Sequence, residues 1–200
     1  MKLDFDIYDE IVDDGMWGGL SSQTFVNAIK DLKEGDELDL HFNSPGGSVV
    51  AGIAMANKVK ELSKKGVKTT AIVEGICASI ATVIMCACEK VKMNKSAFCM
   101  IHNCWAVVQG DAEELRKQAD VMEKMNEAIL SFYRSKFDLT DDELKAYMDE
   151  ETWFSGSEAQ NFKFNCEVID DEDVKLQLAA KFDLTRFHKI PEALNMTSNE

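Results

Sequence analysis

Basic residues are scarce in this sequence relative to acidic ones. Its 200 residues include 22 lysines and arginines against 36 aspartates and glutamates, and the formal net charge is −14. Nucleic-acid-binding proteins need a basic surface that displaces counterions, and anionic membranes attract basic segments. The charge therefore argues against both, and we expect no nucleic acid and no membrane among the partners.

Segments that would carry the chain into or across a membrane are also lacking. The acidic N-terminus, residues 1–15, has no apolar stretch of the kind found in secretory signals. The most apolar run, residues 76–88, contains Ser and Thr and is shorter than the roughly 20 residues of a transmembrane helix. With 46% apolar residues the chain can bury the core of one domain, so we expect a soluble cytoplasmic protein.

Paired metal ligands are absent as well. No two cysteines form the Cys-x-x-Cys pair typical of zinc sites, and the sequence has no Gly-x-x-x-x-Gly-Lys phosphate loop. We therefore expect no metal and no cofactor. The six cysteines are interpreted as small buried apolar residues in a reducing compartment: Cys77, Cys86, Cys88, Cys99, Cys104 and Cys166.

Strand-like and helix-like segments alternate along the chain, which indicates an α/β fold with a largely parallel sheet. The predicted strands are residues 3–7, 37–43, 67–73, 91–93, 97–102 and 167–169. The predicted helices are residues 23–32, 49–65, 79–88, 111–136, 140–149 and 155–161. In the second helix, the residues expected to face the core are Val49, Ile53, Ala54 and Val59.

The helix predicted at residues 111–136 is the longest, and its amphipathic pattern leaves two interpretations open. It either covers the sheet or projects from it and serves assembly. Thr140 and Glu143 form a predicted capping box at the start of the next helix. After residue 184 the chain turns polar, so we predict a domain at residues 1–184 and a polar C-terminal tail at residues 185–200.

A serine lies inside the most apolar run, in the segment GICASIATVIMCAC. Ser79 is interpreted either as a cap or packing residue of a buried helix, or as a nucleophile at its start. Amide N–H groups at a helix N-terminus would stabilise negative charge developing there. Upstream, NSPGGSV at residues 43–49 is either an ordinary strand–helix turn or a turn whose glycines let N–H groups approach an oxyanion.

One histidine and a run of acids complete the candidates. His102 ends a predicted strand, where it is either a general base or a hydrogen-bonded structural residue, whereas His41 and His188 lack such a position. Residues 148–159, MDEETWFSGSEA, place several acids before an aromatic pair. These acids either supply a carboxylate that orients a histidine or form a solvated helix end.

Taken in order, these segments resemble the Clp protease proteolytic-subunit (ClpP) family. The shared pattern is SPGG before a small-residue helix, then Gly-x-x-Ala-Ser, then Met-Ile-His, then an acid before Phe-Ser-x-x-Glu-Ala, within residues 3–171. The stretches IHNCW, YRSK and MDEETWFSGSEA are most similar to ClpP-like head-maturation proteases of tailed phages. The resemblance implies a ClpP/crotonase-like spiral of β-β-α units with a long projecting oligomerisation helix.

The resemblance also implies a serine endopeptidase with a Ser-His-acid triad that processes phage capsid or scaffold proteins in the host cytoplasm. The matching positions are the catalytic residues Ser79, His102 and Glu151 and the oxyanion-hole residues Gly47, Ser48 and Ile80. Two departures leave alternatives open. Glu151 stands where the family usually has Asp, so Asp149 and Glu150 compete for the role, and Cys104 replaces the usual Pro and offers a thiol nucleophile.

Family members form rings, so the partners that the resemblance implies are a polypeptide substrate and further copies of this chain. We expect a heptamer or a double heptamer, with residues 111–136 at the ring–ring contact. The chain begins almost at the first predicted strand, without the segment that touches an AAA+ ATPase in housekeeping Clp peptidases. We therefore do not expect an AAA+ ATPase partner.

Three rival interpretations remain. The chain is a catalytically inactive ring scaffold with the same fold, or a crotonase-type enzyme that binds acyl-CoA in a glycine-containing oxyanion hole. In the third, a Ser-Lys peptidase would take its base from Lys90, Lys92 or Lys95, which lie beyond the nucleophile helix.

Overall fold

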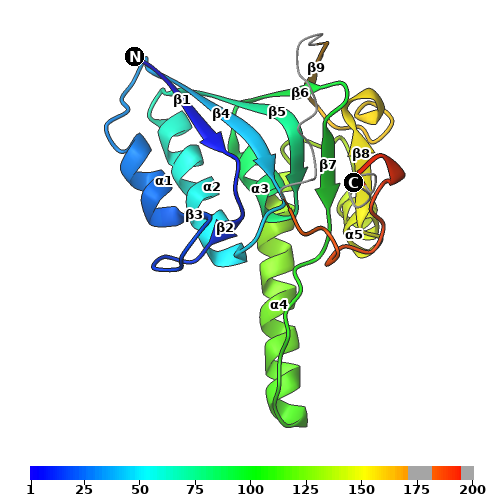
Figure 1. The fold of residues 1–200 in the computed structure, drawn as a ribbon. Helices are drawn as coiled ribbons and strands as arrows, with labels where there is room; N and C mark the ends of the chain where they lie inside the picture. The colour runs from blue at the N-terminus through cyan, green and yellow to red at the C-terminus, as the bar shows by residue number, and fades with distance from the viewer. Residues whose placement is uncertain (171–181, 195–200) are drawn as a thin grey trace, which may run out of the picture.

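A seven-stranded β-sheet forms the centre of the protein (Figure 1). The structure is a computed structural model that describes residues 1–170 and 182–194. The strands of this sheet are β1 (Lys2–Ile7), β4 (Glu37–Ser44), β5 (Lys68–Ala78), β6 (Lys90–Asn94), β7 (Phe98–Ile101), β8 (Thr152–Ser155) and β9 (Glu167–Ile169). A separate two-stranded ribbon joins β2 (Ile11–Val12) to β3 (Leu20–Ser21) in parallel.

The sheet is parallel except at one edge. Its main order is β1-β4-β5-β6-β9, with every neighbouring pair parallel. The 11-residue strand β5 serves two neighbours, because its first half pairs with β6 and its last three residues pair with β7. Strand β8 then adds to β7 in the antiparallel direction. The prediction of an α/β fold with a largely parallel sheet is confirmed.

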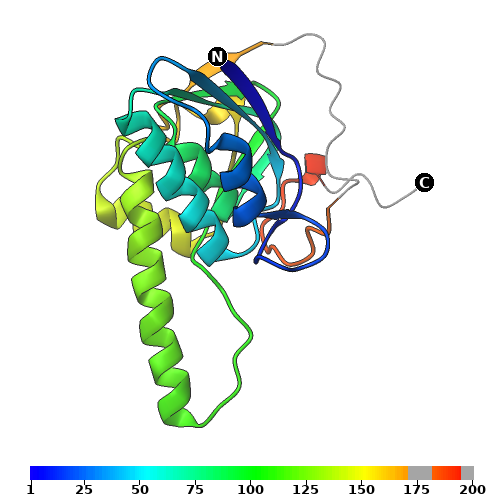
Figure 2. The same ribbon diagram turned by 90° about the vertical axis from the view of Figure 1, so that its left-hand side faces the viewer.

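Helices α1 (Ser22–Ile29), α2 (Val49–Lys64) and α3 (Ile80–Ala87) cover one face of the sheet (Figures 1 and 2). Helix α4 (Ala112–Tyr133) extends well beyond the body of the protein, and the chain that leads into it runs out along the same direction (Figure 2). Helix α5 (Asp141–Asp149) follows and opens with the predicted capping box of Thr140 and Glu143. Among the described helices, none is long and apolar enough to cross a membrane.

Helix α3 lies at the centre of the core, and all eight of its residues are buried. Helix α2 packs against it, and the buried residues of α2 are Ala51, Gly52, Met55, Ala56, Val59 and Leu62. The prediction that Ala54 faces the core is wrong, since Ala54 is exposed, while Val49 and Ile53 are only partly buried. The buried face is rotated because Gly52, which has no side chain, lies directly against Ile80 of α3.

Short elements account for most of the other differences from prediction. The strands β2, β3 and β8 have two to four residues, too few for an alternating pattern to show. The helix predicted at residues 155–161 is a single 3-10 turn, Gly156–Glu158. The cysteines are as expected: all six are free thiols, five of them buried and Cys166 partly exposed.

The described part of the C-terminal segment, residues 182–194, packs on the sheet. Leu184, Phe187 and Leu194 are buried against Ile76 and Met100 of β5 and β7. The domain boundary at residue 184 stays a prediction, and the outer part of the tail, residues 195–200, lies outside the described residues. Apolar contacts therefore continue beyond the predicted boundary, onto the strands that carry the candidate site.

We predict that Gly52→Ala destabilises the protein, although alanine favours helix formation more than glycine does. A Cβ at this position would lie 2.3 Å from Ile80 Cγ1, so α2 and α3 would have to separate. We expect the free energy of unfolding in urea, measured by circular dichroism, to fall by about 1–3 kcal/mol. Ala54→Ser on the exposed face of α2 is the control, and a Gly52→Ala protein as stable as wild type would contradict the packing described.

Candidate active site

Ser79 occupies a sharp turn between the end of β5 and the start of α3. Its backbone is in the left-handed region, with φ 56° and ψ −130°, which is uncommon for a residue other than glycine. The surroundings hold this conformation: Ser79 N–H donates to Met100 O at 2.9 Å, and Ser79 O accepts from Thr82 N at 3.0 Å and Thr82 Oγ1 at 2.5 Å. Strained backbone of this kind concentrates at functional sites because the fold must maintain it.

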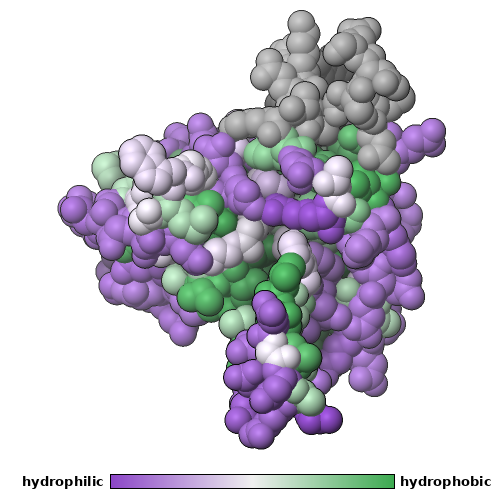
Figure 3. Space-filling view, turned by 60° about the horizontal axis from the view of Figure 1, so that its bottom comes forward, coloured by the Kyte–Doolittle hydropathy of each residue, from purple (hydrophilic) through white to green (hydrophobic). Residues whose placement is uncertain are grey.

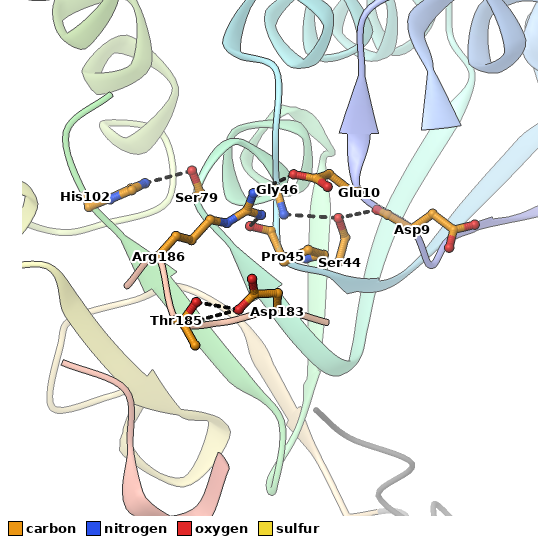
Figure 4. A network of polar contacts seen from close by, with 10 residues as sticks. All are labelled: Asp9, Glu10, Ser44, Pro45, Gly46, Ser79, His102, Asp183, Thr185 and Arg186. Carbon is orange, nitrogen blue, oxygen red and sulfur yellow. Dashed lines mark hydrogen bonds and ion pairs between the residues drawn. The ribbon is translucent and has the colours of Figure 1, made fainter. Parts of the chain in front are cut away.

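The Pro45–Gly47 loop lies directly against this turn. A Cβ on Gly46 would sit 2.7 Å from Ser79 Cβ and 2.6 Å from Ala78 O, and Gly46 and Gly47 both have positive φ values, 87° and 143°. Ser44 supports the loop from below, since its hydroxyl donates to Asp9 O at 2.7 Å and accepts from Gly46 N–H at 3.2 Å (Figure 4). Only glycine allows so close an approach to the serine.

The three predicted oxyanion-hole residues differ in what their N–H groups do. Ser48 N–H donates to Ile11 O at 2.7 Å, and the Ser48 hydroxyl donates to Asp13. Within residues 1–170 and 182–194, the N–H groups of Gly47 and Ile80 have no hydrogen-bond acceptor. These two amides, on either side of the Ser79 turn, are therefore the ones available to an oxyanion.

His102 follows β7 and meets the serine directly. Its Nε2 lies 2.8 Å from Ser79 Oγ, within hydrogen-bond distance (Figure 4). Burial lowers the pKa of His102 to about 4; the Glu151 charge opposes this shift, and the positive charges of Arg186 and His188 add to it. The imidazole is therefore neutral near pH 7, the form that accepts a proton from a hydroxyl.

Glu151 is the buried member of the three acids at the end of α5, Asp149 to Glu151, with only 7% of its surface exposed. It also has a positive φ, 51°. Its charge raises the pKa of His102, but no hydrogen bond joins the two residues in the described part of the chain. Asp149 instead accepts from Asn103 Nδ2 at 2.6 Å, and the exposed Glu150 pairs with Lys189. Of the three candidates, Glu151 is the one whose charge acts on the histidine.

The alternative nucleophile and bases have other partners. Cys104 donates its thiol hydrogen to Met122 O at 3.4 Å, and burial raises the pKa of the thiol, which disfavours the thiolate. Lys92 and Lys95 pair with Glu167 at 3.7 Å and Asp170 at 3.6 Å. Lys90 is exposed at the start of β6. The structure therefore favours the serine and the histidine over these alternatives.

Ser79 and His102 open into a cleft of about 350 Å³. Gly47, Ser48 and Cys104 also line it, and its remaining walls come from residues that were not predicted as site residues: Glu10, Ile11, Val12, Asp13, Met16, Val49, Trp105, Arg186 and Phe187. The last two belong to the segment interpreted as a polar tail. Its apolar residues, among them Phe187, were a signal that this segment is anchored, but nothing in the sequence says where.

Chemically, the site combines a hydroxyl in contact with a neutral imidazole, a buried carboxylate nearby and two free amides. Such a set can perform nucleophilic acyl transfer. Residues 10–172 match the Clp protease family. Relatives named "ATP-dependent Clp protease proteolytic subunit" include one from Borrelia garinii subsp. bavariensis, 24% identical over 79% of this chain and 86% of its own length.

Two further relatives have a comparable sequence identity to this chain. A "proteolytic subunit 2" from Synechococcus sp. is 29% identical over 70% of both chains. A "proteolytic subunit 3" from Rhodococcus jostii is 29% identical over 76% of this chain and 73% of its own length. The chain therefore belongs to the Clp protease family, which indicates a serine peptidase.

Proposed function

We propose that the protein is a serine endopeptidase in which Ser79 is the nucleophile and His102 the general base. The observation that carries this proposal is the 2.8 Å contact between His102 Nε2 and Ser79 Oγ, at a strained turn that exposes the hydroxyl to a cleft. A serine used only as a helix cap would accept a hydrogen bond from the first turn of α3, and the Ser79 side chain makes no such bond.

The proposed mechanism follows from these positions. Neutral His102 takes the Ser79 proton as Oγ attacks the peptide carbonyl, and the N–H groups of Gly47 and Ile80 stabilise the oxyanion. His102 then gives the proton to the leaving amine, which releases the first product and leaves an acyl-enzyme. Water, activated by the same imidazole, hydrolyses the acyl-enzyme and regenerates Ser79.

We assign the third role to Glu151. A carboxylate beside the histidine stabilises the imidazolium that forms during attack and fixes the ring orientation. The buried position of Glu151 and the effect of its charge on His102 support this assignment over Asp149 and Glu150. The Ser48 N–H takes no part in the proposed oxyanion hole, because it already donates to Ile11 O.

We further propose that copies of the chain form a heptameric ring, or two stacked heptamers that meet through α4. The projecting helix and the segment before it expose large apolar side chains: Trp105, Val107, Val108, Leu115 and Val121. Figure 3 shows apolar surface that continues from the body of the protein onto this projection. A second copy would cover it.

The sequence similarities to head-maturation proteases suggest the substrate. We propose limited processing of phage capsid or scaffold proteins in the host cytoplasm, on the basis of IHNCW and MDEETWFSGSEA. An inactive ring scaffold and an acyl-CoA-binding enzyme are the rival functions. Both lack a reactive serine, so the first test below separates them from a peptidase.

The first prediction concerns Ser79. We expect a fluorophosphonate probe to add once to the wild-type protein and not to Ser79→Ala, because only an activated serine attacks the reagent. Intact-mass analysis measures the adduct, and light scattering on the same sample checks that it is assembled. An assembled wild-type protein without an adduct would overturn the peptidase proposal in favour of a scaffold, and a thermal shift with acyl-CoA would then favour the acyl-CoA enzyme.

The second prediction separates the three acids. Glu151→Gln should lower kcat for peptide hydrolysis by about 10²- to 10⁴-fold, since the imidazolium loses its carboxylate. Asp149→Asn and Glu150→Gln are matched controls that remove one charge each and should stay within a few-fold of wild type. If either control lost more activity than Glu151→Gln, the assignment of the acid would be wrong.

The third prediction concerns pH. Burial lowers the pKa of His102 to about 4. The histidine therefore stays neutral at mildly acidic pH, where an ordinary histidine with a pKa of about 6.5 is protonated. As the pH is lowered, kcat/KM should therefore fall with an apparent pKa of about 4. Circular dichroism at each pH checks that the protein remains folded, and an acid limb at the ordinary value would contradict the burial argument.

A further inference from the structure

Residues 182–189, which we call the C-terminal strap, contact the candidate site at three separate places. At the first, Arg186 Nη1 forms an ion pair with Glu10, and Nη2 donates to Pro45 O at 3.2 Å (Figure 4). Pro45 precedes the glycines of the proposed oxyanion hole. The guanidinium therefore joins the strap to the loop that positions the Gly47 amide.

The second contact is with the proposed base. The ring of Phe187 meets the His102 imidazole edge to face, with centroids 5.7 Å apart at 74°. Trp153 of β8 also packs edge to face on Phe187, with the centroids 5.7 Å apart. Because Phe187 is 5% exposed, it excludes water from one side of the imidazole and fixes the plane of the ring.

The third contact is with the proposed acid. The backbone N–H groups of His188 and Lys189 donate to Glu151 Oε1 at 2.7 and 2.6 Å, and Trp153 Nε1 donates to the same oxygen at 3.3 Å. Hydrogen bonds to a charged oxygen are stronger than neutral ones. They hold the carboxylate through Oε1, and Oε2 has no hydrogen-bond partner among the described residues, so it is the oxygen left for His102.

The strap itself has a defined local structure. Asp183 Oδ1 accepts from the Thr185 N–H at 3.0 Å and from its hydroxyl at 2.6 Å, and Phe187 N–H donates to Leu184 O at 2.9 Å. Leu184 is buried against the sheet. The strap is thus anchored on one side by apolar packing and on the other by its contacts with the site.

We propose that the C-terminal strap is a positioning element of the peptidase site, fixed by Arg186, that holds Glu151 against His102 and joins both to the oxyanion loop. This inference rests on the proposed function. It makes Arg186 a positioning residue, because it acts through Pro45 and the strap and not on the scissile bond. The strap would hold the loops of the site in fixed positions, which matters because small displacements of catalytic groups lower rates strongly.

The strap also changes the charge that His102 experiences. The charged groups that act on the imidazole are Glu151, which favours protonation, and Arg186 and His188, which oppose it. Removal of the Arg186 charge therefore shifts the pKa of His102 upward. In a variant that stays folded around the site, a change elsewhere in the fold would leave the pKa of His102 where it is, since burial of the imidazole would be unaltered.

The test compares Arg186→Ala with Arg134→Ala in the full-length chain. Arg134 is the matched control, since it forms a two-point ion pair with Asp141, at 2.7 Å for both contacts, outside the site. The readouts are the pH titration of His102 by NMR, with the three histidines assigned by single substitution, and kcat and KM for a peptide substrate. Thermal unfolding confirms that each variant is folded.

We expect Arg186→Ala to raise the pKa of His102 and to lower kcat by about 10- to 100-fold with little change in KM. Arg134→Ala should match wild type in both readouts. A folded Arg186→Ala protein with wild-type kcat and wild-type His102 titration would overturn the proposal. A loss of kcat with an unmoved His102 titration would also overturn it, because the strap would then have no effect on the imidazole.

A second pair of variants tests the backbone contact to the acid. Lys189→Ala keeps the N–H that donates to Glu151 and loses only the exposed pair with Glu150, whereas Lys189→Pro loses the N–H as well. We expect kcat to be lower in the proline variant than in the alanine variant. Equal kcat values in the two folded proteins would contradict the proposed role of the strap. The NMR titration needs no activity, so a wild-type protein without a reactive serine would refute the peptidase while leaving the strap's effect on His102 measurable.

Discussion

The close approach of the Pro45–Gly47 loop to the Ser79 turn is the constraint on which the site depends. With 2.7 Å between Ser79 Cβ and the place of a Cβ on Gly46, no other residue type fits without separating the two segments. This contact brings the free amides of Gly47 and Ile80 to either side of one hydroxyl. A second close approach, of Gly52 in α2 to Ile80 in α3, lies next to it.

The site is assembled from strand ends and loops held by a rigid sheet. Ser79 directly follows the last residue of β5, and His102 directly follows the last residue of β7, which pairs with the last three residues of β5. The parallel register therefore sets the distance between nucleophile and base. Within residues 1–170 and 182–194, three residues other than glycine have positive φ; Ser79 and Glu151 lie at this site, and Lys163 lies elsewhere. Backbone strain thus coincides with the proposed catalytic groups.

Burial lowers the pKa of His102 and the Glu151 charge raises it, and burial dominates. A histidine that stays neutral serves as a proton acceptor from serine, and the nearby Glu151 charge becomes useful once the imidazole is positive. The C-terminal strap contributes to both effects, through the apolar Phe187 ring and through its hydrogen bonds to Glu151. The strap, near the C-terminal end of the described chain, therefore influences a site whose nucleophile and oxyanion loop come from the first half of the sequence.

The sequence by itself determined the α/β class, the capping box at Thr140, the burial of five cysteines and the candidates Ser79 and His102, because these follow from local periodicity and from ordered motifs. It left the choice among Asp149, Glu150 and Glu151 open, since neighbouring residues differ in direction only once the chain is folded. Tertiary structure also determines three other features. The Ser48 amide is already bonded to Ile11 O, a different face of α2 is buried from the one expected, and Arg186 contacts Glu10 and Pro45. Each depends on segments far apart in the sequence, whose proximity comes from sheet register and helix packing and leaves no local pattern.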